Sequence, residues 1–265
     1  MEIRFSVTLP YSEIVREAPG LKEKGLDVEV EIQDAHWLLT TCEMSSVRRV
    51  GDFLRERNIE VSVNGPIFDL NPGSFDDFIR EHTKNVFMKT IELAINIGGS
   101  RVILPSGFTP FLTGEASTGW KKLSIEIWKA CVGKAVEHDI TVCVENRFEH
   151  IPLVLTDIVD ELKTEMFGIC LDIGHVHVYS RKRLPHWIKE SGGITKEIQL
   201  NDNDGKTDSH LALGEGNVDI PGLFRALHSR RLWPPMVFEM SIDQAERSLK
   251  YLDSRGILSF QPKLF

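Results

Sequence analysis

Four apolar segments in the second half of the chain each carry, at or near their end, a residue that can ligate a metal ion or transfer a proton. The segments and their polar residues are Thr141–Glu145 with Glu145, Phe167–Asp172 with Asp172, Ile194–Leu200 with Gln199, and Met236–Met240 with Glu239. Each segment is short and rich in aliphatic residues, as buried parallel strands are. If the four are strands of one barrel, their polar residues meet at one edge of it.

The chemistry that this group favours is the binding of one divalent metal ion. Three converging carboxylates repel one another, which raises their pKa values unless a cation lies among them. The amide oxygen of Gln199 completes an oxygen-rich set, which suits Mn²⁺ or Mg²⁺ better than Zn²⁺ because zinc prefers nitrogen or sulfur ligands. The sequence therefore predicts a single manganese or magnesium site at Glu145, Asp172, Gln199 and Glu239.

A second group of polar residues follows the same segments. His175 comes three residues after Asp172, and we expect the two to share one loop. Asp208 and His210 lie in a long segment after Gln199 that is rich in turn-forming residues. We interpret the two histidines as functional, and the acidic residues of the Asn-Asp-Asn-Asp-Gly run in that segment as turn formers.

These residues are positioned by an alternation of short apolar runs and longer amphipathic segments along the whole chain. The eight predicted strands are Ile3–Leu9, Leu26–Ile32, Glu60–Val63, Arg101–Leu104, Thr141–Glu145, Phe167–Asp172, Ile194–Leu200 and Met236–Met240. Alternation of this kind is typical of repeated βα units on a parallel sheet. Eight units close a barrel, so we predict an α/β fold, a (β/α)₈ barrel with residues 1–265 in one domain.

The predicted helices lie between these strands. Ser74-Phe75-Asp76-Asp77 has the pattern of a capping box, and the helix that it opens repeats apolar residues at helical spacing until Gly98 and Gly99 end it. The other predicted helices are Tyr11–Lys24, Ser46–Arg57, Trp120–His138, Pro152–Lys163, Leu184–Glu190, Ile220–Arg230 and Ile242–Ser254. An open doubly wound sheet is the alternative, but no glycine-rich phosphate-binding sequence follows the first strand.

Composition limits what the chain binds. Hydrophobic residues make up 42% of the 265 and charged residues 26%, as in ordinary globular proteins. The net charge of −8 is unfavourable for contact with a phosphate backbone, so we expect a small-molecule partner and no nucleic acid. No apolar run reaches the length of a membrane span and no signal-peptide pattern is present, so we expect a cytoplasmic protein with no membrane association. The widely spaced Cys42, Cys131, Cys143 and Cys170 indicate reduced thiols.

Segments around the predicted ligands resemble the xylose-isomerase-like superfamily of barrels. They are ENRFEH around Glu145, LDIGHVH around Asp172 and His175, QLNDNDGKTDSHLALGEGNVDI from Gln199 to Ile220, VFEMS around Glu239, and VNGPIFDLNPGS from Val63 to Ser74. The superfamily includes sugar and sugar-phosphate isomerases, ketose 3-epimerases, hydroxypyruvate isomerases and barrel-type apurinic endonucleases. The resemblance is strong in the C-terminal half of the chain and weak in the N-terminal half.

This resemblance implies a sugar or sugar-phosphate isomerase or epimerase that depends on a divalent metal. In similar families the ligands are Glu, Asp, His or Gln, and Glu at the ends of strands five to eight, which match the four residues above. The resemblance further implies that Glu145 and Glu239 transfer a proton next to a carbonyl, through an enediolate that the metal stabilises. It implies that His175 contacts the substrate, with His210 as a further candidate.

Two other functions stay open. The apurinic endonucleases bind three zinc ions, and three of their histidine ligands are replaced in this chain. The replacing residues are Asn64, Pro105 and Gln199. His175, Asp208 and His210 nevertheless match the third zinc site of that family, so a second ion at these residues stays open. A barrel that keeps the scaffold without the reaction is the other alternative.

The first half of the chain says less about the substrate. Candidate pocket residues from its loops are Asp34, His36, Trp37, Phe68 and Phe108, each of which fits ordinary packing equally well. The identity of the substrate, the choice between isomerase and epimerase, and the formation of a homo-oligomer are left open by the sequence.

Overall fold

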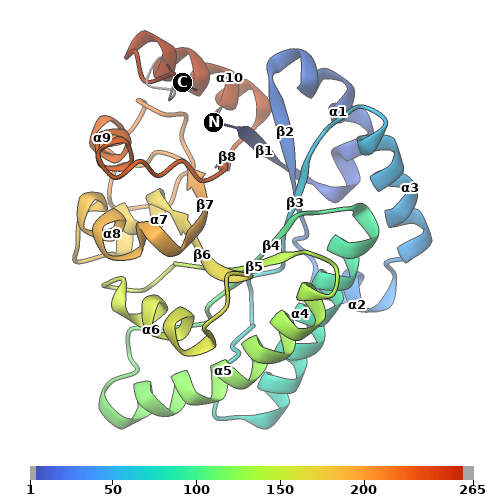
Figure 1. Cartoon of the computed structure of the whole chain (residues 1–265), viewed down its shortest axis with the longest axis vertical. Coiled ribbons are helices and arrows are strands. Elements are labelled where there is room, and N and C mark those ends of the chain that lie inside the picture. Colours follow the sequence, from blue (N-terminus) through green and yellow to red (C-terminus); the bar gives the residue numbers. More distant parts are fainter. Residues whose placement is uncertain (1–3, 259–265) are drawn as a thin grey trace.

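Eight apolar segments of the chain form parallel strands that close into a barrel, with the helices packed around it (Figure 1). The computed structural model describes residues 4–258. The strands are β1 (Phe5–Pro10), β2 (Leu26–Glu31), β3 (Val61–Asn64), β4 (Arg101–Pro105), β5 (Thr141–Glu145), β6 (Phe167–Asp172), β7 (Thr195–Leu200) and β8 (Met236–Phe238). Each pairs with the next along the chain, and β8 pairs with β1. The predicted (β/α)₈ barrel is confirmed, and the open sheet is excluded.

The observed strands agree with the predicted ones to within two residues at each end, because both faces of a barrel strand are buried and the apolar run marks its length. β5 and β6 begin and end at the predicted residues. β8 ends at Phe238, so Glu239 lies one residue beyond the strand and not inside it. Ile3, the predicted first residue of the first strand, lies outside the described residues.

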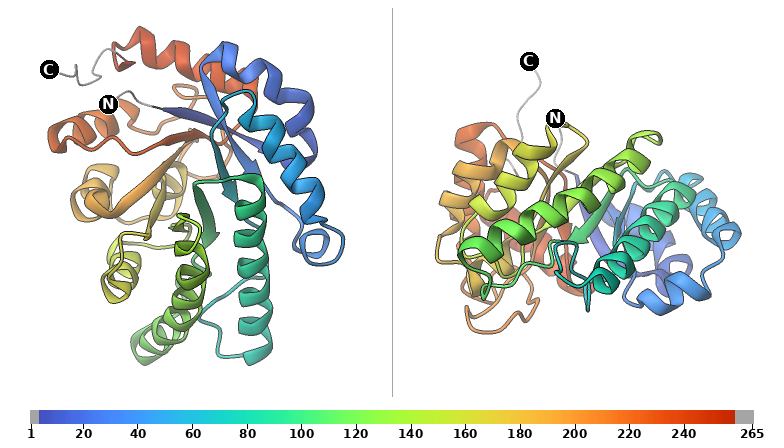
Figure 2. Two further views of the ribbon diagram at one scale, coloured as in Figure 1. Left: turned by 45° about the vertical axis from the view of Figure 1, so that its right-hand side comes forward. Right: turned by 90° about the horizontal axis from the view of Figure 1, so that it is seen from below.

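The helices surround the barrel, and α4 and α5 are the two long ones that pack side by side (Figure 2). They are α1 (Ile14–Leu21), α2 (Ala35–Thr40), α3 (Met44–Arg55), α4 (Asp77–Ile97), α5 (Gly114–Val136), α6 (Leu153–Leu162), α7 (Ile173–Tyr179), α8 (Leu184–Ser191), α9 (Ile220–Arg230) and α10 (Ile242–Ser254). Short 3₁₀ turns are η1 (Tyr11–Glu13), η2 (Lys22–Lys24) and η3 (Gly192–Ile194). Among residues 4–258, no helix combines the length and apolar character that crossing a bilayer requires.

Two short helices, α2 and α7, are absent from the sequence prediction. The more consequential is α7, because it begins directly after Asp172 and contains His175. The expectation that these two residues share an irregular loop is therefore wrong. Helices of six or seven residues show too few turns for a clear apolar periodicity, and tertiary packing decides whether they form.

The predicted capping box at the start of α4 is also wrong. The N-cap is Asp76, whose carboxylate accepts a hydrogen bond from the backbone N–H of Phe78 at 2.8 Å. The Ser74 hydroxyl accepts one from the Asp76 N–H instead, at 3.2 Å. A carboxylate caps a helix as well as a hydroxyl does, so the nearer acidic residue takes this position. The helix ends at Gly98, with a left-handed φ of 80°, as predicted.

Polar side chains fill much of the barrel interior. Glu29 on β2 accepts hydrogen bonds from residues on three other strands, namely Thr8, Ser62, Asn64 and Gln199. Glu197 on β7 pairs with Arg101 on β4, with 2.7 Å between Oε2 and Nε. Buried charges of this kind are tolerated only when they are paired or hydrogen-bonded. The interior therefore forms a polar floor beneath the ends of the strands.

The cysteines are free thiols. Cys143 and Cys170 lie inside the barrel with Ile103 in a small apolar cluster, and Cys131 is buried on α5. Cys42 is only partly buried. Burial raises the pKa of Cys131 to about 12, which keeps that thiol protonated.

Candidate metal centre

The carboxyl ends of β5 to β8 bring the four predicted ligands to one mouth of the barrel. Glu145 and Asp172 are the last residues of β5 and β6. Gln199 on β7 is in register with Asp172. Glu239 follows β8 directly, and its backbone N–H donates to the Leu200 carbonyl at 3.2 Å. The four residues thus follow one another around half of the barrel rim.

The carboxylates of Glu145 and Asp172 lie close enough to Glu239 to affect the ionisation of that residue. Glu145 and Asp172 place oxygens, together with a nitrogen of His175, within 4.8 Å of one another. Burial, together with the charges of Asp172 and Glu145, raises the pKa of Glu239 well above its usual range. Within the described residues, Oε2 of Glu239 is buried without a hydrogen-bond partner, since Nδ1 of His210 lies 3.8 Å away.

Hydrogen bonds on several sides hold Asp172 in place. Its Oδ1 accepts from the backbone N–H of His175 at 2.6 Å, which makes Asp172 the N-cap of α7. Its Oδ2 accepts from Nδ2 of Asn201 at 2.8 Å. The Asn146 amide donates to the Asp172 carbonyl at 3.0 Å and accepts from its N–H at 2.8 Å. Such supporting contacts orient a metal ligand before it binds.

Asn146 is missed by the sequence prediction, which places Asn201 only in a turn-rich polar segment and gives it no supporting role. Each stands one or two residues after a predicted ligand, in the sequences Glu145-Asn146 and Gln199-Leu-Asn201. That proximity is a usable signal, because residues just past a strand end point into the same mouth.

The side chain of Gln199 has one partner and one unpaired atom. Its Nε2 donates to Oε1 of Glu29 at 3.2 Å, while Oε1 is buried with no hydrogen-bond partner among residues 4–258. An unpaired buried acceptor costs about 1–3 kcal/mol, a cost that a bound cation removes. The contact with Glu29 assigns the nitrogen to the barrel interior and leaves the oxygen for a ligand.

His175 is enclosed by hydrogen-bond acceptors. Its Nδ1 lies 2.8 Å from the Asn146 carbonyl and 3.2 Å from Oε1 of Glu145, and its Nε2 lies 2.9 Å from Oδ2 of Asp208. Burial alone would lower the pKa of His175, but the carboxylates of Asp172, Asp208 and Glu145 outweigh it and raise the pKa well above its usual value. An imidazole with acceptors on both nitrogens is stabilised as the cation.

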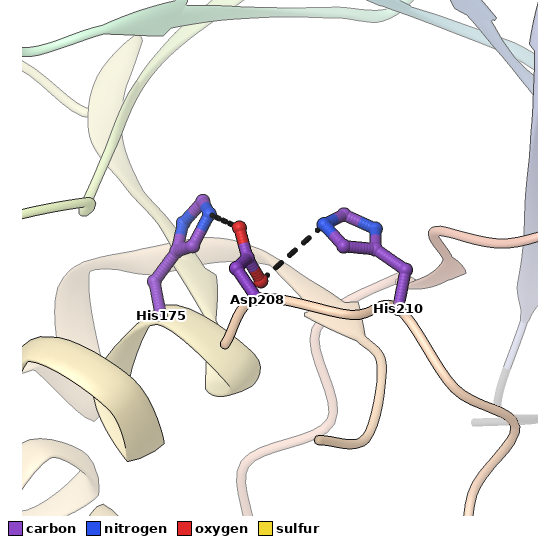
Figure 3. A group of neighbouring side chains, drawn as sticks. All are labelled: His175, Asp208 and His210. Atoms are coloured by element: carbon purple, nitrogen blue, oxygen red, sulfur yellow. Dashed lines mark hydrogen bonds and ion pairs between the residues drawn. The ribbon is translucent and has the colours of Figure 1, made fainter. Parts of the chain in front are cut away.

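Asp208 lies between two histidines (Figure 3). Its Oδ2 pairs with His175, and its Oδ1 lies 3.4 Å from Nε2 of His210. Burial would raise the pKa of Asp208, but the hydrogen bonds and charges of the two histidines lower it strongly. Nδ1 of His210 lies 2.9 Å from the Glu239 carbonyl. The structure thus brings these three residues together as a chain of side chains next to the carboxylates.

The residues present fit a divalent cation. Within residues 4–258, oxygens of Gln199 and Glu239 are buried and unpaired. Glu239 interacts with the carboxylates of Glu145 and Asp172, and Gln199 is in register with Asp172. A cation among these groups removes the mutual repulsion of the carboxylates and gives the amide oxygen a partner. The four predicted ligands offer only oxygens, which favours hard divalent ions over softer ones, while the nearby His175 offers a ring nitrogen.

Two cavities adjoin this centre. The larger, of about 680 Å³, is lined by Glu239 and His210, and the smaller, of about 270 Å³, by Glu145. Phe68 and Phe108, which the sequence suggests as pocket residues, line the smaller cavity. The other three suggested residues lie around α2, where Asp34 is the N-cap and Trp37 packs against Tyr11, with His36 between them.

Comparison with known sequences identifies relatives among archaeal proteins. The uncharacterized protein MJ1311 of Methanocaldococcus jannaschii is 27% identical over 174 residues, which are 63% of this chain and 59% of that protein. The uncharacterized protein MJ1614 of the same organism is 24% identical over 172 residues, 61% of this chain and 63% of that protein. The match therefore spans less than two thirds of the length of either relative.

Comparison with solved structures identifies barrels of the same shape. The TTHB071 protein from Thermus thermophilus, in a crystal soaked with ZnCl₂, is 25% identical with a TM-score of 0.81, covering 99% of this chain and 100% of that one. A D-tagatose 3-epimerase-like protein is 21% identical with a TM-score of 0.81, covering 97% and 98%. An L-ribulose 3-epimerase is 16% identical with a TM-score of 0.77, covering 99% and 97%.

A sequence model of one family spans most of the barrel. The family is described as "Xylose isomerase-like TIM barrel", and its model matches residues 27–256. The matched region runs from β2 through α10 and contains every residue of the centre described above. With the closed barrel, this match shows that the chain belongs to the xylose isomerase-like TIM barrel family.

Proposed function

We propose that this chain is a divalent-metal-dependent isomerase or epimerase that acts on a sugar-like hydroxy-carbonyl compound. The observation that carries the proposal is the interaction of the carboxylates of Glu145, Asp172 and Glu239 at the ends of β5, β6 and β8. Gln199, in register with Asp172 on the next strand, adds a buried amide oxygen without a partner among residues 4–258. The same centre opens into two cavities, which gives a small substrate access to it.

Glu145, Asp172, Gln199 and Glu239 would hold the ion. When bound, a divalent ion supplies the polarisation of a carbonyl that makes the neighbouring C–H acidic. Asn146 and Asn201 hold Asp172 in its position, and Glu29 does the same for Gln199. This support keeps the ligands in one arrangement before the substrate enters.

The proton transfer itself falls to Glu145 and Glu239. They stand three strands apart around the barrel and line different cavities, so they face a substrate at the centre from two sides. One carboxylate can remove a proton from carbon and the other return it to the opposite face, which is epimerisation. Return of the proton by the same carboxylate to the neighbouring carbon is isomerisation.

The two histidines take different parts in this proposal. Both nitrogens of His175 already face acceptors within the protein, so we assign it the role of orienting Glu145 and Asp208. The His210 side chain is about one third exposed and lines the larger cavity. His210 is therefore placed to hydrogen-bond a substrate oxygen, with Asp208 holding its ring.

Proteins that share this fold suggest which substrates and metals to test first. The D-tagatose 3-epimerase-like protein and the L-ribulose 3-epimerase have the same barrel, so ketoses and ketose phosphates are the substrates to test. The TTHB071 crystal was soaked with ZnCl₂, so zinc joins manganese and magnesium in the metal panel.

The test is the exchange of solvent deuterium into carbon. Protein loaded with each metal is incubated with the panel in D₂O, and we expect deuterium at the carbon next to the carbonyl of one substrate. Glu145→Gln and Glu239→Gln keep an oxygen ligand but cannot accept the proton, so turnover should fall by roughly 10²-fold or more. The matched control is Glu161→Gln, which makes the same change at the exposed end of α6 and should leave turnover unchanged.

The same experiment distinguishes the proposed isomerase from a metal-dependent endonuclease. DNA with abasic sites is incubated with the loaded protein beside the ketose panel. We expect the DNA to stay intact. Nicked DNA together with an unlabelled ketose panel would show that the isomerase proposal is wrong.

A further inference from the structure

The cavity beside Glu145 is lined by an arginine whose donors are unused. Arg147 stands two residues after the end of β5, and its side chain forms no ion pair or hydrogen bond within residues 4–258. Its Nε is buried and unpaired. A guanidinium offers five N–H donors in a planar fork, and a buried donor without an acceptor is unfavourable. These donors are available to a group that enters the cavity.

Two aromatic rings flank this guanidinium. Its central carbon lies 5.8 Å from the ring centre of Phe68 and 5.5 Å from that of Phe148. Contacts with ring faces orient a guanidinium while leaving its N–H edge free. Together with the buried Phe108, these rings give the cavity an apolar wall that suits the C–H face of a small polyol.

The cavity connects Arg147 with the proposed reaction centre, because Glu145 lines it as well. The other acidic residue on its wall is Asp69, which is exposed, so water screens its charge. Glu145 in turn belongs to the proposed metal centre, where a cation offsets its charge. Arg147 is the one Lys or Arg among the described residues that line this cavity.

The larger cavity on the other side of the centre has the opposite character. Its charged wall residues are Glu13, Glu17, Glu31, Glu239, Asp243 and His210, without any Lys or Arg among the described residues that line it. An anionic group in that cavity would face several carboxylates, whereas in the smaller cavity it faces a guanidinium. The two ends of a bound substrate therefore meet different charges.

We propose that the substrate carries an anionic group, a phosphate or a carboxylate, at its end away from the reacting carbon, and that Arg147 binds this group. A planar guanidinium binds either oxyanion through parallel N–H···O bonds. This inference rests on the proposed function and names the substrate class of that site.

The test compares three ketoses that share one carbon skeleton and differ in the terminal group, D-fructose, D-fructose 6-phosphate and D-fructuronate. Binding to the manganese-loaded protein is measured by titration calorimetry. We expect one of the two anions to bind at least about tenfold more tightly than fructose, the usual gain from a charge-assisted pair. Which of the two it is distinguishes a phosphate site from a carboxylate site.

Variants assign the preference to Arg147. Arg147→Gln should abolish the preference for the anion, so that the anion and fructose bind with similar affinity, and measurable binding of fructose shows that the cavity is intact. Arg147→Lys keeps the charge but loses the fork, and should retain part of the preference. The matched control, Arg230→Gln, removes the same charge from the exposed end of α9 and should keep the full preference.

Each outcome bears on one of the two proposals. Equal binding of all three ketoses, binding of none, or an equal loss in Arg230→Gln overturns the inference. If fructose exchanges deuterium and binds as tightly as the anions, the isomerase stands and the inference fails. If an anion binds through Arg147 but no ketose exchanges deuterium, the anion site stands and the isomerase fails.

Discussion

At the scale of single residues, the orientation of one amide decides the character of the centre. Glu29 holds the nitrogen of Gln199, so the oxygen is the atom left without a partner among residues 4–258 and free to ligate an ion. An amide oxygen is a hard and neutral ligand, and with it the donor set contains no nitrogen or sulfur atom. The predicted preference for manganese or magnesium over zinc therefore depends on this residue.

Substitution of Gln199 tests this dependence. Gln199→His replaces the oxygen by an imidazole nitrogen, so the selectivity should shift toward zinc. A competition titration with Mn²⁺ and Zn²⁺ measures it. Gln199→Leu is the control, because it removes the ligand and should weaken binding of both ions. Selectivity in Gln199→His equal to that of the unmodified protein would show that Gln199 is not a ligand.

At the scale of elements, the junction between β6 and α7 positions two of the proposed site residues at once. Asp172 ends the strand and caps the helix, and His175 lies in the first turn. The helix packs so closely on Asn201 that a Cβ at Gly174 would lie 1.8 Å from Oδ1 of that residue. Glycine at this position therefore lets Asn201 reach Asp172.

Gly174→Ala should destabilise this junction. Displacing Asn201 and α7 should lower the free energy of unfolding by about 1–3 kcal/mol, the range for overpacked sites. Metal affinity should fall as well, since Asp172 loses its support. The matched control is Gly133→Ala on α5, where a Cβ meets no atom within 4 Å and should stabilise the helix by about 0.5–1 kcal/mol. Denaturant unfolding of both variants measures the difference, and a Gly174→Ala variant as stable as the parent contradicts the packing argument.

Glu29 on β2 is buried against Gln199 and Glu197 on β7, and we expect its ionisation to make the free energy of unfolding depend on pH. Burial and the neighbouring Glu197 raise the pKa of Glu29 well above its ordinary value of 4.5. A carboxyl that holds its proton more tightly in the folded state contributes most stability at low pH, and loses that contribution as the pH rises from its ordinary pKa toward the folded one.

Glu29→Gln isolates this contribution, because the amide cannot ionise and still accepts the hydrogen bond from Gln199. As the pH rises above the ordinary pKa of 4.5, the unfolding free energy of the variant should fall less than that of the parent chain. Denaturant unfolding at several pH values measures both slopes. Parallel slopes would mean that Glu29 is ionised in the folded protein.

At the scale of the whole molecule, a bound ion would link the strands that form half of the barrel. The proposed ligands come from β5, β6, β7 and the residue after β8, which are separated by helices along the chain but adjacent around the rim. The unfolded chain holds no such arrangement, so an ion that binds the barrel stabilises the folded state.

Manganese should therefore raise the melting temperature. At about 100 times the dissociation constant, binding adds about 2.7 kcal/mol, which corresponds to about 5–10 °C for a chain of this size. Thermal unfolding with Mn²⁺ and with EDTA measures the shift. Asp172→Ala should lose it, and Asp253→Ala, at an exposed position on α10, should keep it. A shift of the same size in both variants would place the ion elsewhere.

The sequence by itself determined the barrel and the identity of its strand ends. Strands buried on both faces are apolar along their whole length, so β5 and β6 could be located to the residue. A polar residue where such a run ends is visible in the sequence. Glu145, Asp172, Gln199 and Glu239 could therefore be named as candidate ligands before any contact between them was known.

Only the tertiary structure decided how these residues are held and what lies beside them. Glu29 and Gln199 are 170 residues apart, and they meet because the barrel closes β2 across from β7. The larger cavity combines residues from opposite ends of the chain, whereas the smaller one, with the unpaired Nε of Arg147, is formed by the segments at and after the ends of β3, β4 and β5. The periodicity of apolar residues indicates whether a side chain is buried. Its hydrogen-bond partners and the charge of a cavity depend on which distant residues face it across the barrel. Closure of the barrel decides which residues those are.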